Sequence, residues 1–235
     1  MKKRLALLVW VVMFAGSICA QKAESQGPQP YDLGGRTVRV PAPESFTDTV
    51  QHYPRIAARL IAAESPQNEV LAVHVTDEIV PQIKAGGEPD LPFYTKVSVW
   101  KQLKGADVET HDFRSLAAEF EKQSPGALQS IAKAGETRAG ERLTTHWGSE
   151  VNLKIGETRL LGIFDSQPQS VSSMFLMSLE MFNRRVLVLG SMSLVHVNKR
   201  ILFLYVFRTP ESAADQDLVA EVTRSWVART VAANK

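Results

Sequence analysis

Five strand-like runs follow one another between residues 151 and 207, and they restrict the fold more than any other part of the sequence. Each run is rich in β-branched, aliphatic or aromatic residues, and short polar segments separate the runs. Three of these segments carry residue pairs typical of tight turns, at Gly156–Glu157, Asn183–Arg184 and Asn198–Lys199. The sequence therefore predicts antiparallel strands over the runs 151–155, 159–164, 171–179, 186–197 and 200–207.

Helical segments before and after these runs favour an α+β fold. The C-terminal segment 212–233 places Leu218, Val222 and Trp226 on one side of a helix, which is the pattern of a helix that packs on a core. We therefore expect an antiparallel sheet flanked by helices, with the C-terminal helix packed on the sheet. Earlier in the chain, we expect helices from about residue 47 and from Asp112, and strands at 36–40, 69–76 and 94–103.

Two stretches of sequence, each followed by an expected helix, resemble a known group of proteins. They read VRVPAPESF at 38–46 and KRILFLYVFR at 199–208, and the helix after the second bears Asp215, Trp226 and Asn234. In these residues the chain resembles an uncharacterised family of exported bacterial proteins, and its order of elements is loosely similar to the PsbP/DcrB-like fold. The resemblance implies an α+β fold over most of the chain, and it transfers no catalytic residue.

The first 20 residues have the three parts of a secretory signal peptide. A positively charged start precedes an apolar run at 5–18, and Ala20 supplies the small residue before a polar segment. We expect cleavage after Ala20 and a periplasmic or secreted protein. Cleavage after Cys19, an uncleaved anchor and a lipoprotein attached through Cys19 remain alternatives.

Cleavage after Ala20 would leave a leader and one folded domain. Residues 21–35 are rich in Gly and Pro and poor in apolar residues, so we expect a flexible leader there. We expect a single α+β domain over 36–235, because a chain of this size can bury a core without covalent staples. The apolar run at 5–18 is shorter than the roughly 20 residues of a membrane-spanning helix, which argues against an uncleaved anchor. Because cleavage would also remove this run, we expect no stable membrane span after cleavage.

Cysteine and charge usage narrow the range of chemistry and of partners that we expect of the mature protein. Cys19 is the only cysteine, so cleavage after Ala20 leaves no disulfide, no thiol nucleophile and no thiolate metal ligand. Cleavage also lowers the basic count from 27 to 24 against 25 acidic residues, which changes the formal net charge from +2 to −1. Because the sequence has no clustered positive excess, we expect no nucleic-acid partner.

Motifs for catalysis or metal binding are not recognisable in the sequence. No two of the five histidines stand four residues apart, as a zinc-binding helix requires. The string Gly190–Ser193 falls inside an expected strand, which is the wrong context for a serine nucleophile. The SxxK matches at 98–101 and 130–133 lack the companion motifs of penicillin-recognising enzymes. We therefore expect no catalytic residue, no cofactor and no metal, while a hydrolase with a triad not visible in sequence remains an alternative.

One alternating strand carries a candidate apolar pocket. Phe175, Met177, Leu179 and Met181 fall on one face of the expected strand, whereas Met174 falls on the other. Clustered methionine thioethers can bind Cu(I), but side chains on opposite faces of a strand do not converge on one ion. Core packing therefore accounts for these methionines. The alternative is that the face with Phe175 lines a pocket for a small apolar ligand.

An aromatic residue in a polar loop is the candidate partner-binding site. His146 and Trp147 lie in the segment 144–150, and an exposed aromatic in such a loop is typical of a recognition surface. A tryptophan folded over the edge of the core is the alternative. With the loop 85–93 as a second contact surface, the main hypothesis is a non-catalytic exported protein that binds a macromolecule, an exported or envelope protein. A binder of a small apolar ligand and a hydrolase are the alternative functions.

Overall fold

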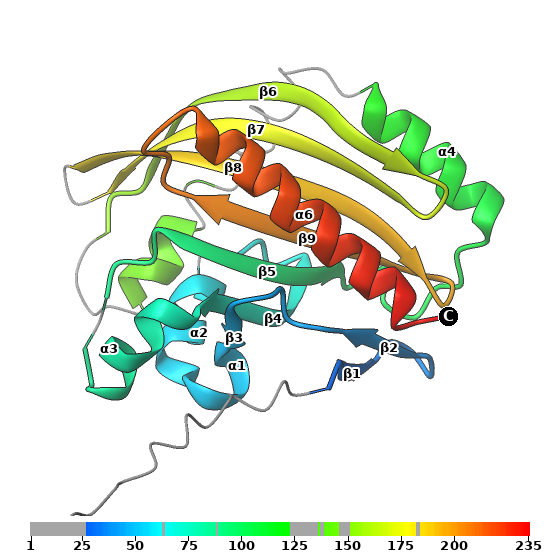
Figure 1. Cartoon of the computed structure of the whole chain (residues 1–235), viewed down its shortest axis with the longest axis horizontal. Helices are drawn as coiled ribbons and strands as arrows, with labels where there is room; N and C mark the ends of the chain where they lie inside the picture. The colour runs from blue at the N-terminus through cyan, green and yellow to red at the C-terminus, as the bar shows by residue number, and fades with distance from the viewer. Residues whose placement is uncertain are drawn as a thin grey trace, which may run out of the picture.

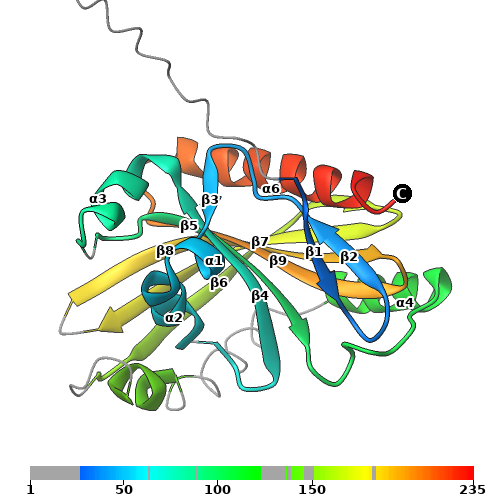
Figure 2. The same ribbon diagram turned by 90° about the horizontal axis from the view of Figure 1, so that it is seen from below.

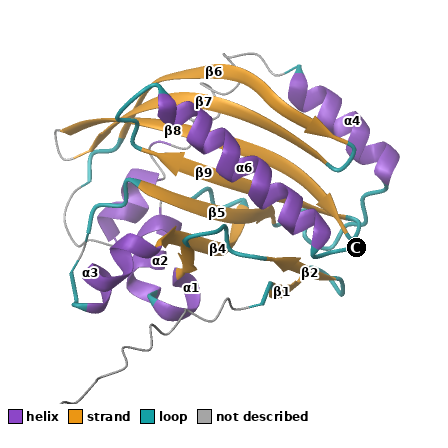
Figure 3. Cartoon of the chain, in the orientation of Figure 1, coloured by secondary structure: helices purple, strands orange, loops and turns teal. Residues whose placement is uncertain are grey.

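The described chain forms a seven-stranded antiparallel sheet with helices on both faces (Figure 1 and Figure 3). This computed structural model describes residues 27–62, 64–87, 89–122, 136, 139–145, 151–181 and 184–235. The strand order is β3-β4-β5-β9-β8-β7-β6, and the predicted α+β fold is confirmed. The strands are β3 (Phe46–Asp48), β4 (Asn68–Thr76), β5 (Phe93–Trp100), β6 (Lys154–Gln167), β7 (Ser170–Met181), β8 (Arg184–Val197) and β9 (Arg200–Arg208).

Helices cover the two faces of the sheet at different places (Figure 2). One face carries α6 over β8 and β9, and the other face carries α4 beside β7 and β8 and α2 beside β4. Among the described residues, no helix is both long and apolar enough to cross a membrane. The helices are α1 (Thr49–His52), α2 (Pro54–Ala62), α3 (Val80–Lys84), α4 (Thr110–Glu121) and α6 (Ala214–Ala232), and a 3-10 turn at Asp77–Ile79 precedes α3.

Strand β9 shows why one continuous apolar run supports two layers of helix. Successive side chains of a strand point to opposite faces. Leu202 and Leu204 accordingly join the core under α6, whereas Ile201 and Phe203 join the cluster under α4. A strand covered on both faces needs apolar residues at every position, which is the pattern of this run.

The hairpin between β8 and β9 has the predicted turn. Asn198 and Lys199 both have left-handed backbones, with φ of 48° and 59°. Two left-handed residues in a two-residue turn match the twist of the strands on either side, and asparagine tolerates this conformation well. Val197 consequently pairs with Arg200, and the register continues without a shift to Leu189 opposite Arg208.

Helix α6 docks on the sheet through Trp226, as predicted. The indole is 1% exposed, and its Nε1 donates to the carbonyl oxygen of Pro41 at 2.7 Å. Small side chains on β8 let the helix approach closely. As a result, Ser191 Oγ of β8 and Thr223 Oγ1 of α6 lie 2.6 Å apart. The predicted contacts Leu218 and Val222 are only partly buried at the rim of this core.

The predicted flexible leader at 21–35 is wrong for its last part. A two-stranded hairpin of β1 (Gln29–Asp32) and β2 (Thr37–Val40) begins before residue 36. Leu33 is fully buried, and the carbonyl oxygen of Leu33 accepts from Nε of the buried Arg200 at 2.6 Å. The two glycines that suggested flexibility, Gly34 and Gly35, instead supply the positive φ angles of the turn.

The predicted turn at Gly156–Glu157 is also wrong. A single strand, β6, runs through this position, and its register with β7 shifts between Ile155 and Thr158. Gly156 lies so close to Ser178 of β7 that a Cβ would clash with the serine side chain. The glycine therefore permits a close approach between strands, which is its other common use besides turns.

Candidate binding site at the open end of the sheet

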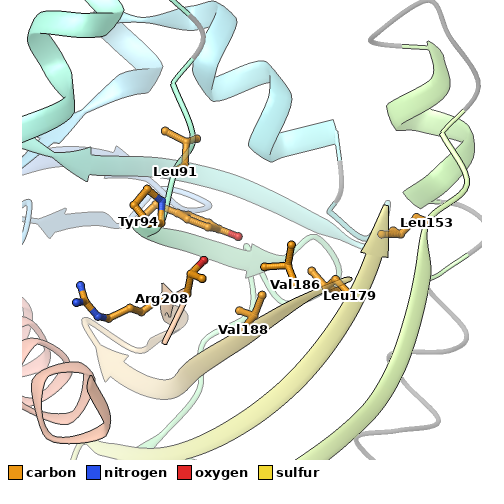
Figure 4. A pocket seen from close by; sticks show the side chains of 9 residues that line it. Leu91, Tyr94, Leu153, Leu179, Val186, Val188 and Arg208 are labelled. Carbon is orange, nitrogen blue, oxygen red and sulfur yellow. The ribbon is translucent and has the colours of Figure 1, made fainter. Parts of the chain in front are cut away.

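An apolar pocket of about 180 Å³ lies where β9 ends and β8 continues beyond it (Figure 4). Its walls come from five separate parts of the chain, so only the fold brings them together. We call it the open-end pocket. The residues that line it are Leu91, Pro92, Tyr94, Leu153, Leu179, Val186, Val188, Arg208 and Thr209.

Strand alternation positions the aliphatic wall of the pocket. In the β7–β8 register Leu179 lies opposite Val186, and Met177 lies opposite Val188. Directly opposed residues in an antiparallel pair share a face, so Leu179, Val186 and Val188 lie on the same face. This is the face that also carries α2 and α4.

Tyr94 of β5 forms the opposite wall. Its ring stacks on Phe207 with 4.9 Å between the centroids, which holds the phenol across the end of β9. In Figure 4 the hydroxyl points toward the side of the pocket lined by Val186. None of the described residues hydrogen-bonds to this hydroxyl, and burial, with the charge of Glu64 second, raises its pKa. Tyr94 therefore stays neutral and can donate one hydrogen bond to an occupant.

Arg208 contributes its stem but not its charge to the pocket. Its guanidinium pairs with Asp215 and lies 5.0 Å from the Phe93 ring centroid. Figure 4 shows the guanidinium turned away from Val186 and Val188. The backbone N–H groups of Ser212 and Glu211, followed by Arg208, lower the pKa of Asp215, so this ion pair is already satisfied. The open-end pocket is thus mainly apolar, with Thr209 and the Tyr94 phenol as the uncharged polar residues of its lining.

Apolar residues are exposed next to the pocket. Val186 is 39% exposed and Leu187, on the opposite face of β8, is 45% exposed. Both lie in the part of β8 that extends past the end of β9. Because the two side chains point to opposite faces, Val186 extends the apolar surface of the pocket and Leu187 is exposed separately on the other face.

The structure brings part of the predicted site together and divides the rest. Leu179 lines the pocket, whereas Phe175 lies on the same face but packs against Phe207, with 6.3 Å between the ring centroids. Met177 is half-buried on that face, and the Met181 side chain lies outside the described residues. The candidate contact residues His146 and Trp147 also lie outside the described residues. Two residues of the predicted contact loop 85–93, Leu91 and Pro92, do line the pocket.

Sequence reasoning missed Tyr94, Val186 and Val188 as site residues. A usable signal was present, because the run 186–197 is four residues longer than the run 200–207 across a two-residue turn. In a hairpin with such a turn, the longer strand must extend past the shorter one. An apolar extension of this kind marks an unpaired end of the sheet.

The described residues do not assemble a hydrolytic or metal site. His74 and His196 are both buried, but on opposite faces of the sheet: His74 contacts Trp226 and His196 stacks on Phe113. Ser191 is buried against Thr223 rather than exposed on a sharp turn. In the same part of the chain, no group of three or more His, Cys, Asp or Glu side chains could hold a metal ion.

A buried ion pair beside the aromatic residues is part of the core rather than of the pocket. Lys96 of β5 pairs with Glu64, and their side chains are 13% and 10% exposed. The Lys96 ammonium also lies 4.6 Å from the centroid of the Tyr205 ring. Although burial alone would raise the pKa of Glu64, Lys96 and hydrogen bonds lower it overall. Each charge is therefore satisfied by its neighbours.

Comparisons with known proteins leave the function open. No protein-family model matches the chain, and no curated protein matches it. Among solved structures, the chain is similar to the Ran-binding protein Mog1p of Saccharomyces cerevisiae at 13% identity, over 87% of this chain and 95% of that one, with a TM-score of 0.35. A TM-score this low carries no argument about this chain. The resemblance to exported bacterial proteins and to the PsbP/DcrB-like fold stays a prediction.

Proposed function

We propose that this protein is a non-catalytic exported protein that docks a protein partner at the open-end pocket. The observation that carries the proposal is an apolar pocket of about 180 Å³ lined by the exposed Val186, with Leu187 exposed on the other face of the same strand. Protein interfaces concentrate their binding energy in a few side chains that fill such pockets. If the first 20 residues are removed on export, the partner would be another exported or envelope protein.

The size of the pocket supports an anchor side chain as its occupant. An apolar cavity of roughly 150 Å³ is large enough to hold benzene. The 180 Å³ of the open-end pocket therefore suits one phenylalanine-sized or leucine-sized side chain. A tyrosine or tryptophan at its mouth could in addition accept from or donate to the Tyr94 hydroxyl.

Site-directed photo-crosslinking in the producing cell tests this proposal. A photoreactive phenylalanine analogue would replace Val186, and in a matched variant it would replace Leu161 of β6, which is 40% exposed compared with 39% for Val186. We expect one defined protein adduct from position 186, none from position 161, and loss of the adduct when Val188→Trp fills the pocket. Equal adducts from both positions, or an adduct that survives Val188→Trp, would contradict docking at this pocket.

A small apolar ligand is the second candidate, and the aliphatic lining of the pocket favours it. Leu179, Val186 and Val188 would surround an aromatic ring, with Tyr94 donating to a polar substituent. Nuclear magnetic resonance titration with p-cresol tests this alternative. Shifts confined to pocket residues, without any protein adduct at position 186, would favour the ligand binder over the docking protein.

A further inference from the structure

The extended end of β8 has a free backbone edge. β8 pairs with β7 over most of its length, from Arg184 opposite Met181 to Val195 opposite Ser170. On its other side β8 pairs with β9 only from Leu189 onward, because β9 ends at Arg208. After Arg208 the chain turns toward β5, where the Thr209 N–H donates to the Pro92 carbonyl oxygen at 2.7 Å. No described residue pairs with residues 184–188 on this side.

Such an edge offers hydrogen bonds to another strand. Alternate residues of an antiparallel strand direct both the N–H and the C=O to the same side. Some of residues 184–188 therefore direct both groups away from β7, into the space beyond the end of β9. Unpaired groups of this kind form a template for an added strand.

The two outermost strands of the sheet have features that limit pairing, although β4 also has no described strand partner beside β3 over residues 68–73. The edge strand β6 has three irregularities in its pairing with β7, and Gly162 there has a φ of 119°. The opposite edge strand, β3, has only three residues. Bulges and short strands are common ways to prevent unwanted pairing at an edge. Residues 184–188 contain no proline and pair with β7 in unbroken register, so the charges of Arg184 and Arg185 are the only edge protection in this segment.

The pocket and the exposed Leu187 lie where the alternating side chains of an added strand would reach. Val186 and Val188 line the open-end pocket on one face of the sheet, and Leu187 is exposed on the other face. A strand beside β8 would place alternate side chains on these two faces. One side chain would then fill the pocket, and its neighbour would cover Leu187.

The charge at the tip of the hairpin indicates the chemistry of the partner. Arg184 and Arg185 are both exposed, and no carboxylate of the described residues forms an ion pair with either of them. Glu180 lies directly opposite Arg185 but pairs with Lys154 at 3.1 Å instead. Two adjacent guanidinium groups without a partner favour an acidic side chain nearby.

We propose that an extended segment of the partner protein adds as a strand along residues 184–188. It places one large apolar or aromatic side chain in the open-end pocket and at least one aspartate or glutamate at the hairpin tip, beside Arg184 on one face or Arg185 on the other. Antiparallel pairing with β8 would put this strand in line with β9. The inference rests on the proposed function, because it assumes that the open-end pocket is a docking site.

The probe for this inference is a peptide rather than an unidentified protein. A random octapeptide library displayed on phage is selected against the purified protein, and the strongest binder is synthesised with a fluorescent label. We expect the selected peptides to combine one large apolar or aromatic residue with at least one acidic residue. Val188→Trp and Arg185→Glu should each weaken binding about tenfold or more, as loss of an interface anchor does. The matched variant Leu161→Trp, at a site of similar exposure on β6, should leave binding unchanged.

Two measurements separate strand addition from simple filling of the pocket. Hydrogen exchange should show that alternate amides of residues 184–188 gain protection when the peptide binds. Methylation of alternate peptide amides should block binding, whereas methylation of the amides between them should have little effect, because only one set faces β8.

Each other outcome overturns a defined part of the inference. Binding that Val188→Trp abolishes, without added amide protection or a methylation pattern, would overturn strand addition and leave the proposed docking function intact. Protection of the same amides without peptide, together with a concentration-dependent dimer in analytical ultracentrifugation, would identify a second copy as the occupant and overturn the peptide partner. Selection of no peptide, or binding insensitive to Val188→Trp, would overturn both proposals.

Discussion

The two ends of β8 belong to one strand but have opposite surroundings. From Leu189 to Val195 the strand pairs on both sides and lies between α6 and α4, and Ser191, Ser193 and Val195 are fully buried. From Arg184 to Val188 it pairs on one side only, and Val186 and Leu187 are exposed. Both ends contain consecutive aliphatic residues, so hydropathy does not separate them. The difference shows that burial depends on neighbouring elements rather than on the residues of the strand itself.

The largest effect that this comparison predicts is at the covered end. Trp226→Ala removes the residue through which α6 docks on the covered face of the sheet and leaves a large cavity beside His74 of β4. We expect a loss of about 3–5 kcal/mol in unfolding free energy, as for other buried aromatics. For a chain of this size that corresponds to a fall in melting temperature of roughly 6–20 °C.

A variant of the same helix provides the control for Trp226→Ala. Leu218 also faces the sheet but is only partly buried. Leu218→Ala should therefore cost clearly less than Trp226→Ala in the same thermal and urea denaturation. Equal losses would mean that α6 does not dock through its tryptophan.

The middle of β8, where the two environments meet, should be sensitive to a single methyl group. Gly190 lies under the Phe175 ring, and a Cβ at this position would clash with it. Gly190→Ala should cost about 1–3 kcal/mol of unfolding free energy, because overpacking forces neighbouring side chains or backbone to shift. Combining it with Phe175→Leu should recover part of the loss in urea denaturation. A double variant no more stable than Gly190→Ala would place the strain elsewhere.

The covered face should also respond to pH through His74. Burial lowers the pKa of His74 to about 3, from 6.5, so the folded protein keeps a neutral imidazole that only the unfolded chain protonates readily. The stability present above pH 6.5 should therefore be lost as the pH falls from 6.5 toward 3, by up to about 1.4 kcal/mol per pH unit. Urea denaturation of the wild type and of His74→Gln across this range would measure it. Parallel pH profiles for the two proteins would mean that His74 does not contribute.

The smallest effect on stability is predicted at the open end. Leu187→Asp changes an exposed side chain beyond the end of β9 and should alter unfolding free energy by less than about 0.5 kcal/mol. It should nevertheless reduce the photo-crosslink from position 186 if a partner covers this residue. A large fall in melting temperature would show that Leu187 already packs in the free protein, and the contrast between the ends of β8 would disappear.

Much of the sheet could be predicted because its signals are local. The Asn198–Lys199 turn, the pairing of the last two strands and the docking of Trp226 are all confirmed. The errors at Gly34–Gly35 and Gly156 share one cause. Glycine serves flexible segments, tight turns and close strand contacts equally well, and only the neighbour shows which use applies.

The candidate site could be predicted only in part. Phe175, Met177 and Leu179 were assigned to one face from alternation alone, and the structure keeps them there. Only Leu179 reaches the pocket, since Phe175 is held over Gly190. Which member of an alternating set lines a cavity depends on what packs opposite, and that information is not in the strand.

By itself, the sequence determined the hairpin of the last two strands, the faces that side chains share along a strand and the tight turn at residues 198–199. These features depend on contacts within a few residues, where turn chemistry and the two-residue period of a strand act. Only the tertiary structure decided that Leu91, Tyr94, Leu153 and Val188 line one pocket. It also decided that β8 extends without a partner beyond β9. Both depend on where distant segments stop relative to one another, and no local preference of the chain encodes that distance.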